Sequence, residues 1–139
     1  MPDEDSMFIW PATGAIQVIP LRSGGCNIKI TFSDQGLVTA IGPGRITKIR
    51  QIPTKRIARQ FEVTIRHSND FESIYNITDL TPHAAKGDAT HLGSVKRLVN
   101  RGDTLYGIVN GGYLHFQLCH AGKLIDPREF MQQANILLL

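Results

Sequence analysis

The sequence predicts an all-β domain built from many short strands. Thirteen glycines and seven prolines interrupt the chain at short intervals. The segments between them are rich in Ile, Val, Phe and Thr, residues that favour strands over helices. The most regular segment, 113–119, alternates apolar side chains with Tyr, His, Gln and Cys, which is the pattern of a strand with one buried face. At 139 residues the chain has the length of a single domain.

Eight strands are expected, each bounded by turn-forming residues. In chain order they span residues 15–21, 27–32, 37–41, 45–51, 60–67, 71–77, 104–109 and 113–119. Glycine and proline in the stretch Ile41-Gly42-Pro43-Gly44 predict a turn before the fourth strand. Ser68-Asn69-Asp70 predicts a hairpin turn between the fifth and sixth strands. Residues 82–94 are expected to form a loop.

The last part of the chain carries signals for a short helix. Asp126 can cap its first turn, Pro127 suits the first helical position, and Glu129 completes a capping box. The segment 92–99 is ambiguous, because its apolar residues also have helical spacing. The sequence leaves a second helix there as an alternative.

The net charge is +3, and several basic residues gather in the middle of the chain. These are Arg45, Lys48, Arg50, Lys55, Arg56, Arg59 and Arg66. Such a cluster can bind nucleic acid, but no aromatic residues for base stacking are interleaved with it. Solvated strand faces are therefore the favoured interpretation, and an acidic glycan would suit the same charge. No apolar run approaches the ~20 residues of a membrane-spanning helix.

Motifs for common enzyme chemistry are absent from the sequence. It contains no HExxH, GxSxG, phosphate-binding loop or CxxC. The five histidines are scattered, and His115 and Cys119 are about 13 Å apart on a strand, too far to share one ion. Cys26 and Cys119 leave two alternatives open, a single disulfide or two free thiols. Arg101-Gly102-Asp103 is expected to be a turn and not an adhesion motif.

The C-terminal third resembles the end of the lysostaphin-type (LytM-like) zinc endopeptidase domain. The likeness rests on the strand 114–118, on Gly122-Lys123, and on Asp126-Pro127 before a short helix. Upstream likenesses keep the family's order and spacing over about residues 8–131. They are Trp10-Pro11 with Gly14, the strand 36–40, Gly44-Arg45-Ile46, the segment 61–67 with Tyr75, and the segment 99–107. The resemblance therefore implies one all-β LytM-like domain over 1–139. Its fold would be an antiparallel twisted sheet, a barrel-sandwich hybrid, with a short C-terminal helix and a groove across one face.

The same resemblance implies a zinc site that this sequence does not complete. The family holds zinc with two histidines and one aspartate, and two further histidines move protons and stabilise the oxyanion. Lys29 stands at the aspartate position, and the first histidine position falls at or near Gly25 or Cys26. Ile77 and Tyr113 replace two of the other histidines, so that only His115 is retained.

We therefore expect a retained fold, lost hydrolase chemistry and no bound cofactor. The former catalytic groove is expected to be a contact surface formed by Lys29, Tyr75, Ile77, Tyr113, His115 and Gln117. By resemblance the domain would act outside the cytoplasm, in the bacterial envelope, and its partner would be peptidoglycan or an envelope protein. The segment 1–7 is acidic and lacks the features of a signal peptide.

Two other functions and one other metal site remain as alternatives at this stage. The first function is an active zinc endopeptidase, which would require a different alignment around 25–29. The second is a polyanion-binding domain that uses the basic residues between 45 and 66, with nucleic acid the less favoured ligand. A replacement metal site could combine Cys26, His115 and one further histidine.

Overall fold

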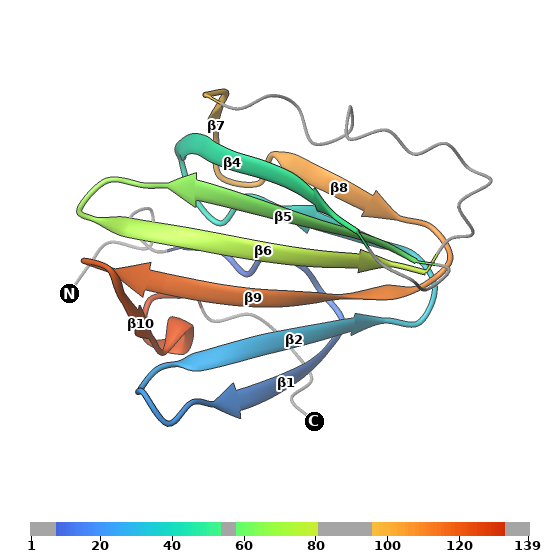
Figure 1. Ribbon diagram of the computed structural model, residues 1–139, viewed down its shortest axis with the longest axis horizontal. Helices are drawn as coiled ribbons and strands as arrows, with labels where there is room; N and C mark the ends of the chain where they lie inside the picture. The colour runs from blue at the N-terminus through green and yellow to red at the C-terminus, as the bar shows by residue number, and fades with distance from the viewer. Residues whose placement is uncertain (1–7, 54–57, 81–95, 133–139) are drawn as a thin grey trace.

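The computed structural model describes residues 8–53, 58–80 and 96–132. Within these ranges the chain forms an all-β structure with a single three-residue 3₁₀ turn (Figure 1). The strands are β1 (Ala15–Pro20), β2 (Cys26–Phe32), β3 (Gly36–Thr39), β4 (Gly44–Ile52), β5 (Arg59–Arg66), β6 (Phe71–Asp79), β7 (Leu98–Val99), β8 (Thr104–Ile108), β9 (Gly112–His120) and β10 (Lys123–Ile125). No helix in the described part of the chain is long and apolar enough to cross a membrane.

Eight strands form one large antiparallel sheet in the order β1-β2-β9-β6-β5-β4-β7, with β10 beside β9. Strands β3 and β8 form a separate antiparallel pair. The long strand β9 lies between β2 and β6, so it joins the N-terminal hairpin to the β4-β5-β6 meander. Figure 1 shows β1 at one end of this sheet and β7 at the other.

All eight predicted strands are present, with ends shifted by one or two residues. Two short strands, β7 and β10, were not predicted. The expected C-terminal helix is only the 3₁₀ turn Pro127–Glu129, although the Asp126 side chain does accept a hydrogen bond from the Arg128 N–H at 3.0 Å. The described end of the ambiguous segment 92–99 is strand β7, and the predicted loop 82–94 lies outside the described residues.

The hairpin turn between β5 and β6 also forms as predicted. Asn69 and Asp70 both have positive φ, 60° and 63°, as the central residues of a type I′ turn require. The His67 N–H donates to the carbonyl of Phe71 at 2.8 Å and closes the turn. The tripeptide 101–103 likewise lies in a turn, with φ of 89° at Gly102.

The core lies between the inner face of the large sheet and the β3–β8 pair. Alternate residues of β2, β5, β6 and β9 are fully buried on this inner face. Val38 and Ile108 bring apolar side chains from the smaller pair, and Tyr106 packs on Phe61 with ring centres 5.2 Å apart. One continuous cluster results, which is the two-layer arrangement that buries the apolar face of a sheet.

The two ends of the described chain are tied together beside this core. Phe8 forms a parallel bridge with Met131, and its N–H donates to the Phe130 carbonyl at 3.0 Å. The Trp10 indole N–H donates to the Gln132 carbonyl at 3.0 Å. These contacts fix the segment before β1 against the segment after β10.

A buried chain of hydrogen bonds links three parts of the core. His67 Nδ1 lies 2.7 Å from the Pro43 carbonyl, and His67 Nε2 lies 2.8 Å from Ser73 Oγ. The Pro43 carbonyl can only accept, so Nδ1 carries the proton and Nε2 accepts from Ser73. Ser73 Oγ is 2.9 Å from Tyr75 Oη. Because Ser73 gives its one proton to His67, the Tyr75 hydroxyl donates to Ser73 Oγ and accepts the Ile41 N–H at 3.1 Å.

Candidate functional site

The outer face of the large sheet carries the polar residues that alternate with the core. Cross-strand register aligns six of them in one row, here called the polar row: Gln17, Lys29, His115, Asn76, Glu62 and Arg50. Every neighbouring pair in this row is directly opposite across two strands, where side chains are close enough to interact. The row therefore crosses six strands without an apolar residue.

Four of the six predicted site residues lie together on this face. Tyr113, His115 and Gln117 project from β9, and Lys29 projects from β2 directly opposite His115. The period-two alternation of strand β9 explains the placement, because its even-numbered residues fill the core. Lys29, Tyr113, His115 and Gln117 therefore share one surface.

Tyr75 and Ile77 do not belong to that surface, which corrects the expectation that all six residues line one groove. Both side chains point into the core and have no exposed area. On β6 the odd-numbered residues face inward, so the outward position between them is Asn76, opposite His115. Tyr75 instead supports the buried hydrogen-bond chain described above.

Lys29, Tyr113 and His115 are in direct contact. Lys29 Nζ lies 4.7 Å from the centre of the Tyr113 ring, within the range of a cation–π interaction. The Tyr113 and His115 rings meet edge to face at 5.3 Å. No carboxylate forms an ion pair with Lys29 among the residues the structure describes. Within the described ranges, the Tyr113 ring is thus the group seen to interact with the Lys29 charge.

The environment keeps His115 neutral. Partial burial lowers the pKa of the imidazole below its usual value, and the nearby Lys29 ammonium lowers the pKa further. At neutral pH the ring therefore has one donor and one acceptor nitrogen. Such a group can hydrogen-bond a ligand.

Amide side chains extend the surface on both sides of the histidine. The Gln117 side-chain amide donates a hydrogen bond to Asn27 Oδ1 across β9 and β2. Asn76 lies opposite His115 on the other side of β9. Asn27, Asn76 and Gln17 were not predicted as site residues, although strict alternation in each strand would have placed them on this face.

The basic residues of β4 and β5 are less available than the sequence suggests. Glu62 forms ion pairs with Lys48 at 2.8 Å and with Arg50 at 3.3 Å. The Lys48 ammonium and Arg50 guanidinium lower the pKa of the Glu62 carboxyl. Arg59 is buried, at 9% exposure, opposite Asp79. Arg45 and Arg66, which are exposed and lie opposite each other on β4 and β5, form no ion pair with a described residue.

No group of three or more His, Cys, Asp or Glu residues is placed to hold a metal within the described ranges. The alternative site built on Cys26 and His115 is not assembled, because Cys26 is on the core side of β2 and His115 is on the outer face. Cys119 is on the outer face as well, so the two cysteines lie on opposite faces and both are free thiols.

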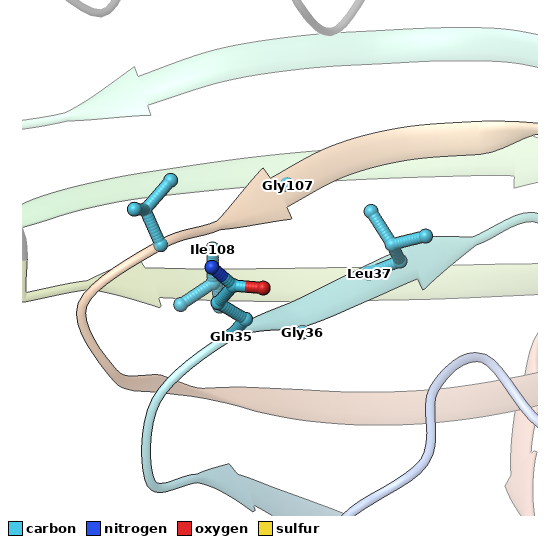
Figure 2. A pocket seen from close by; sticks show the side chains of 6 residues that line it. Gln35, Gly36, Leu37, Gly107 and Ile108 are labelled. Carbon is cyan, nitrogen blue, oxygen red and sulfur yellow. The ribbon is translucent and has the colours of Figure 1, made fainter.

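A hollow elsewhere on the molecule has a different character. Figure 2 shows its lining at the start of β3 and the end of β8. Its volume is about 470 Å³. Leu37 and Val109 are more than half exposed there, and Gln35 is its one polar side chain. Such a lining offers contact area but no acid, base or metal ligand.

Comparison with known proteins does not assign the chain to a family. No protein-family model matches the chain, and no curated protein matches it.

Proposed function

We propose that this protein is a non-catalytic LytM-like domain that binds peptidoglycan, or a regulatory partner there, in the bacterial cell envelope. The observation that carries the proposal is the contact between Lys29, Tyr113 and His115 on the outer face. In the resemblance these positions correspond to an aspartate and two histidines of the zinc-dependent family.

The chemistry of this surface supports binding over catalysis. An ammonium group at the position of a metal ligand repels a divalent cation, and a tyrosine in place of a histidine removes another ligand. The position of the remaining catalytic histidine holds Ile77, which is buried in the core. A zinc-activated water would need about three protein ligands, and His115 is one.

Peptidoglycan fits the groups that the outer face offers. Its peptides carry carboxylates, for which Lys29 is a cation without an acidic partner in the described chain. Its glycan carries hydroxyl and acetamido groups, which match the donor and acceptor capacity of Asn27, Asn76 and Gln117. The half-buried Tyr113 ring gives an apolar contact beside them.

The direct test is co-sedimentation of the purified protein with purified peptidoglycan sacculi. Lys29→Gln and Tyr113→Ala should each release the protein into the supernatant at salt concentrations where the parent chain sediments. Lys123→Gln is the matched control, because it removes one exposed positive charge from β10, several residues along β9 from the contact. Equal loss for Lys29→Gln and Lys123→Gln would reduce the effect to net charge and refute this surface.

Metal analysis and peptide cleavage separate the proposal from the enzyme alternative. We expect no stoichiometric zinc after purification in zinc-containing buffer, and no cleavage of glycine-rich peptides or sacculi. About one zinc per chain together with cleavage would establish a zinc endopeptidase and overturn the non-catalytic proposal.

A further inference from the structure

The outermost strand of the large sheet, β1, is an interaction surface that the proposed function does not use. In the described part of the chain β1 pairs with β2 alone. Figure 1 shows it at the end of the sheet, beyond β2. One long side of its backbone therefore has no partner strand among those residues.

The register identifies the backbone groups on that open side. The Leu21 N–H donates to the Gly25 carbonyl at 3.1 Å, which makes these two residues a hydrogen-bonded pair of the hairpin. Because such pairs alternate along antiparallel strands, Pro20, Val18 and Ile16 direct their backbone groups away from β2. Pro20 agrees with this assignment, since a proline without an N–H is tolerated where an edge faces outward.

The two ends of the sheet are protected to different degrees. At the opposite end, β4 has a register irregularity between Ile46 and Lys48, carries Lys48 and Arg50, and is partly covered by the short end strand β7. Bulges, charged side chains and covering strands are the usual devices that prevent edge-to-edge pairing. β1 has the sequence AIQVIP, with no charged residue and a single proline at its end.

We propose that β1 pairs in an antiparallel arrangement with β1 of a second copy of this chain, about a two-fold axis at Gln17. Ile16 of each copy then faces Val18 of the partner subunit, and each such pair exchanges two backbone hydrogen bonds. This register uses both outward N–H groups of each strand. It joins the two large sheets edge to edge in one continuous sheet.

Side-chain complementarity favours a second copy over an unrelated peptide. In this register Ile16 and Val18 meet on the inner side, where Ile16 is fully buried and Val18 half-buried. On the outer side the exposed Gln17 faces its own symmetry mate, and two amides can hydrogen-bond reciprocally. Ala15 faces Ile19 there, so no charge is desolvated and every cross-strand pair is compatible. An isologous contact of this kind is the commonest basis of homodimers.

Sedimentation velocity tests the proposal with the intact chain. The contact is small, so we expect a concentration-dependent dimer between about 10 µM and about 1 mM. Gln17→Lys and Gln17→Glu should each make the protein monomeric in that range, because like charges would face each other at the axis. An equimolar mixture of the two variants should restore the dimer. Gln51→Lys, the same substitution on an exposed position of β4, should leave dimerisation unchanged.

Each other result would overturn the proposal. A parent chain that is monomeric up to about 1 mM has no such interface. A dimer that persists in both Gln17 variants, or is not restored on mixing, uses another surface or register. Slow hydrogen exchange of the Ile16 and Val18 amides in a monomer would show that another segment of the chain already covers this edge. A melting temperature for each variant close to that of the parent excludes unfolding as the cause of dissociation.

Discussion

Removal of one buried hydroxyl group tests whether the hydrogen-bond chain of the core is structural. In Tyr75→Phe the ring stays in place, but the Ile41 N–H loses its acceptor at 3.1 Å. Both residues have no exposed area, so water cannot replace the hydroxyl without a rearrangement of the core. A buried donor left without a partner costs about 1–3 kcal/mol. His67 and Ser73 keep their mutual contact at 2.8 Å, so the loss should be confined to the tyrosine end of the chain.

The assay is equilibrium unfolding in urea, with thermal melting as a second measure. A loss of about 2 kcal/mol corresponds to a fall of roughly 6–10 °C in Tm for a domain of this size. Tyr113→Phe is the matched control, because the Tyr113 hydroxyl makes no hydrogen bond within the described residues and its side chain is half-exposed. We expect it to change stability by less than about 0.5 kcal/mol. Equal effects of the two substitutions, or an unchanged Tyr75→Phe protein, would refute a structural role for this hydroxyl.

Three further predictions follow from particular contacts. Lys29→Gln should raise the pKa of His115, because it removes the ammonium that opposes protonation; an NMR titration of the imidazole that shows no shift, or a fall, would contradict this. Burial lowers the pKa of His67, so the unfolded chain takes up its proton first, and the unfolding free energy should fall between about pH 7 and about pH 5. Urea midpoints that are constant or rise over that interval would be inconsistent with a buried neutral histidine. Gly112→Ala should destabilise the fold by at least about 2 kcal/mol, because its Cβ would lie 2.2 Å from a backbone carbonyl of β6. Gly107→Ala, whose Cβ would make only an ordinary contact at 3.7 Å, should unfold close to the parent in the same urea titration.

The strands could be predicted because the turn residues between them act locally. Glycine, proline and the Asn69-Asp70 pair mark the points where the backbone reverses, and their conformations depend on few distant contacts. The C-terminal helix was predicted from capping residues that also suit a single turn. Asp126 does cap, but the chain is held by pairing of Phe8 with Met131, a contact between segments far apart in the sequence. Such long-range pairing leaves no local pattern.

The site was predicted in part because one of its strands is strictly alternating. On β9 each outward residue is polar or aromatic and each inward one is apolar or glycine, so Tyr113, His115 and Gln117 were placed on one face. β6 breaks that rule, since Ser73 is buried while Ile74 faces outward. Its alternation cannot be read from hydrophobicity alone. The family motif was therefore the basis for placing Tyr75 and Ile77 in the groove, and the side of the strand was wrong.

The place of β9 in the sheet has a consequence for how the molecule is made. Ribosomes release the chain from its N-terminus, so the β1–β2 hairpin emerges long before residues 112–116, with which β2 must pair. The β4-β5-β6 meander emerges next and also waits for β9 on one side. Two nascent half-sheets thus coexist with unsatisfied edges until a single late strand is inserted between them.

Such an order of assembly makes folding slow and cooperative, because the pairing between β2 and β9 closes a long loop before it gains stability. It also makes the newly synthesised protein dependent on its C-terminal third. A chain interrupted before Gly112 would retain the β1–β2 hairpin and the β4-β5-β6 meander but no strand to join them. The edges of β2 and β6 would then stay exposed, and such edges are those on which chaperones and proteases act.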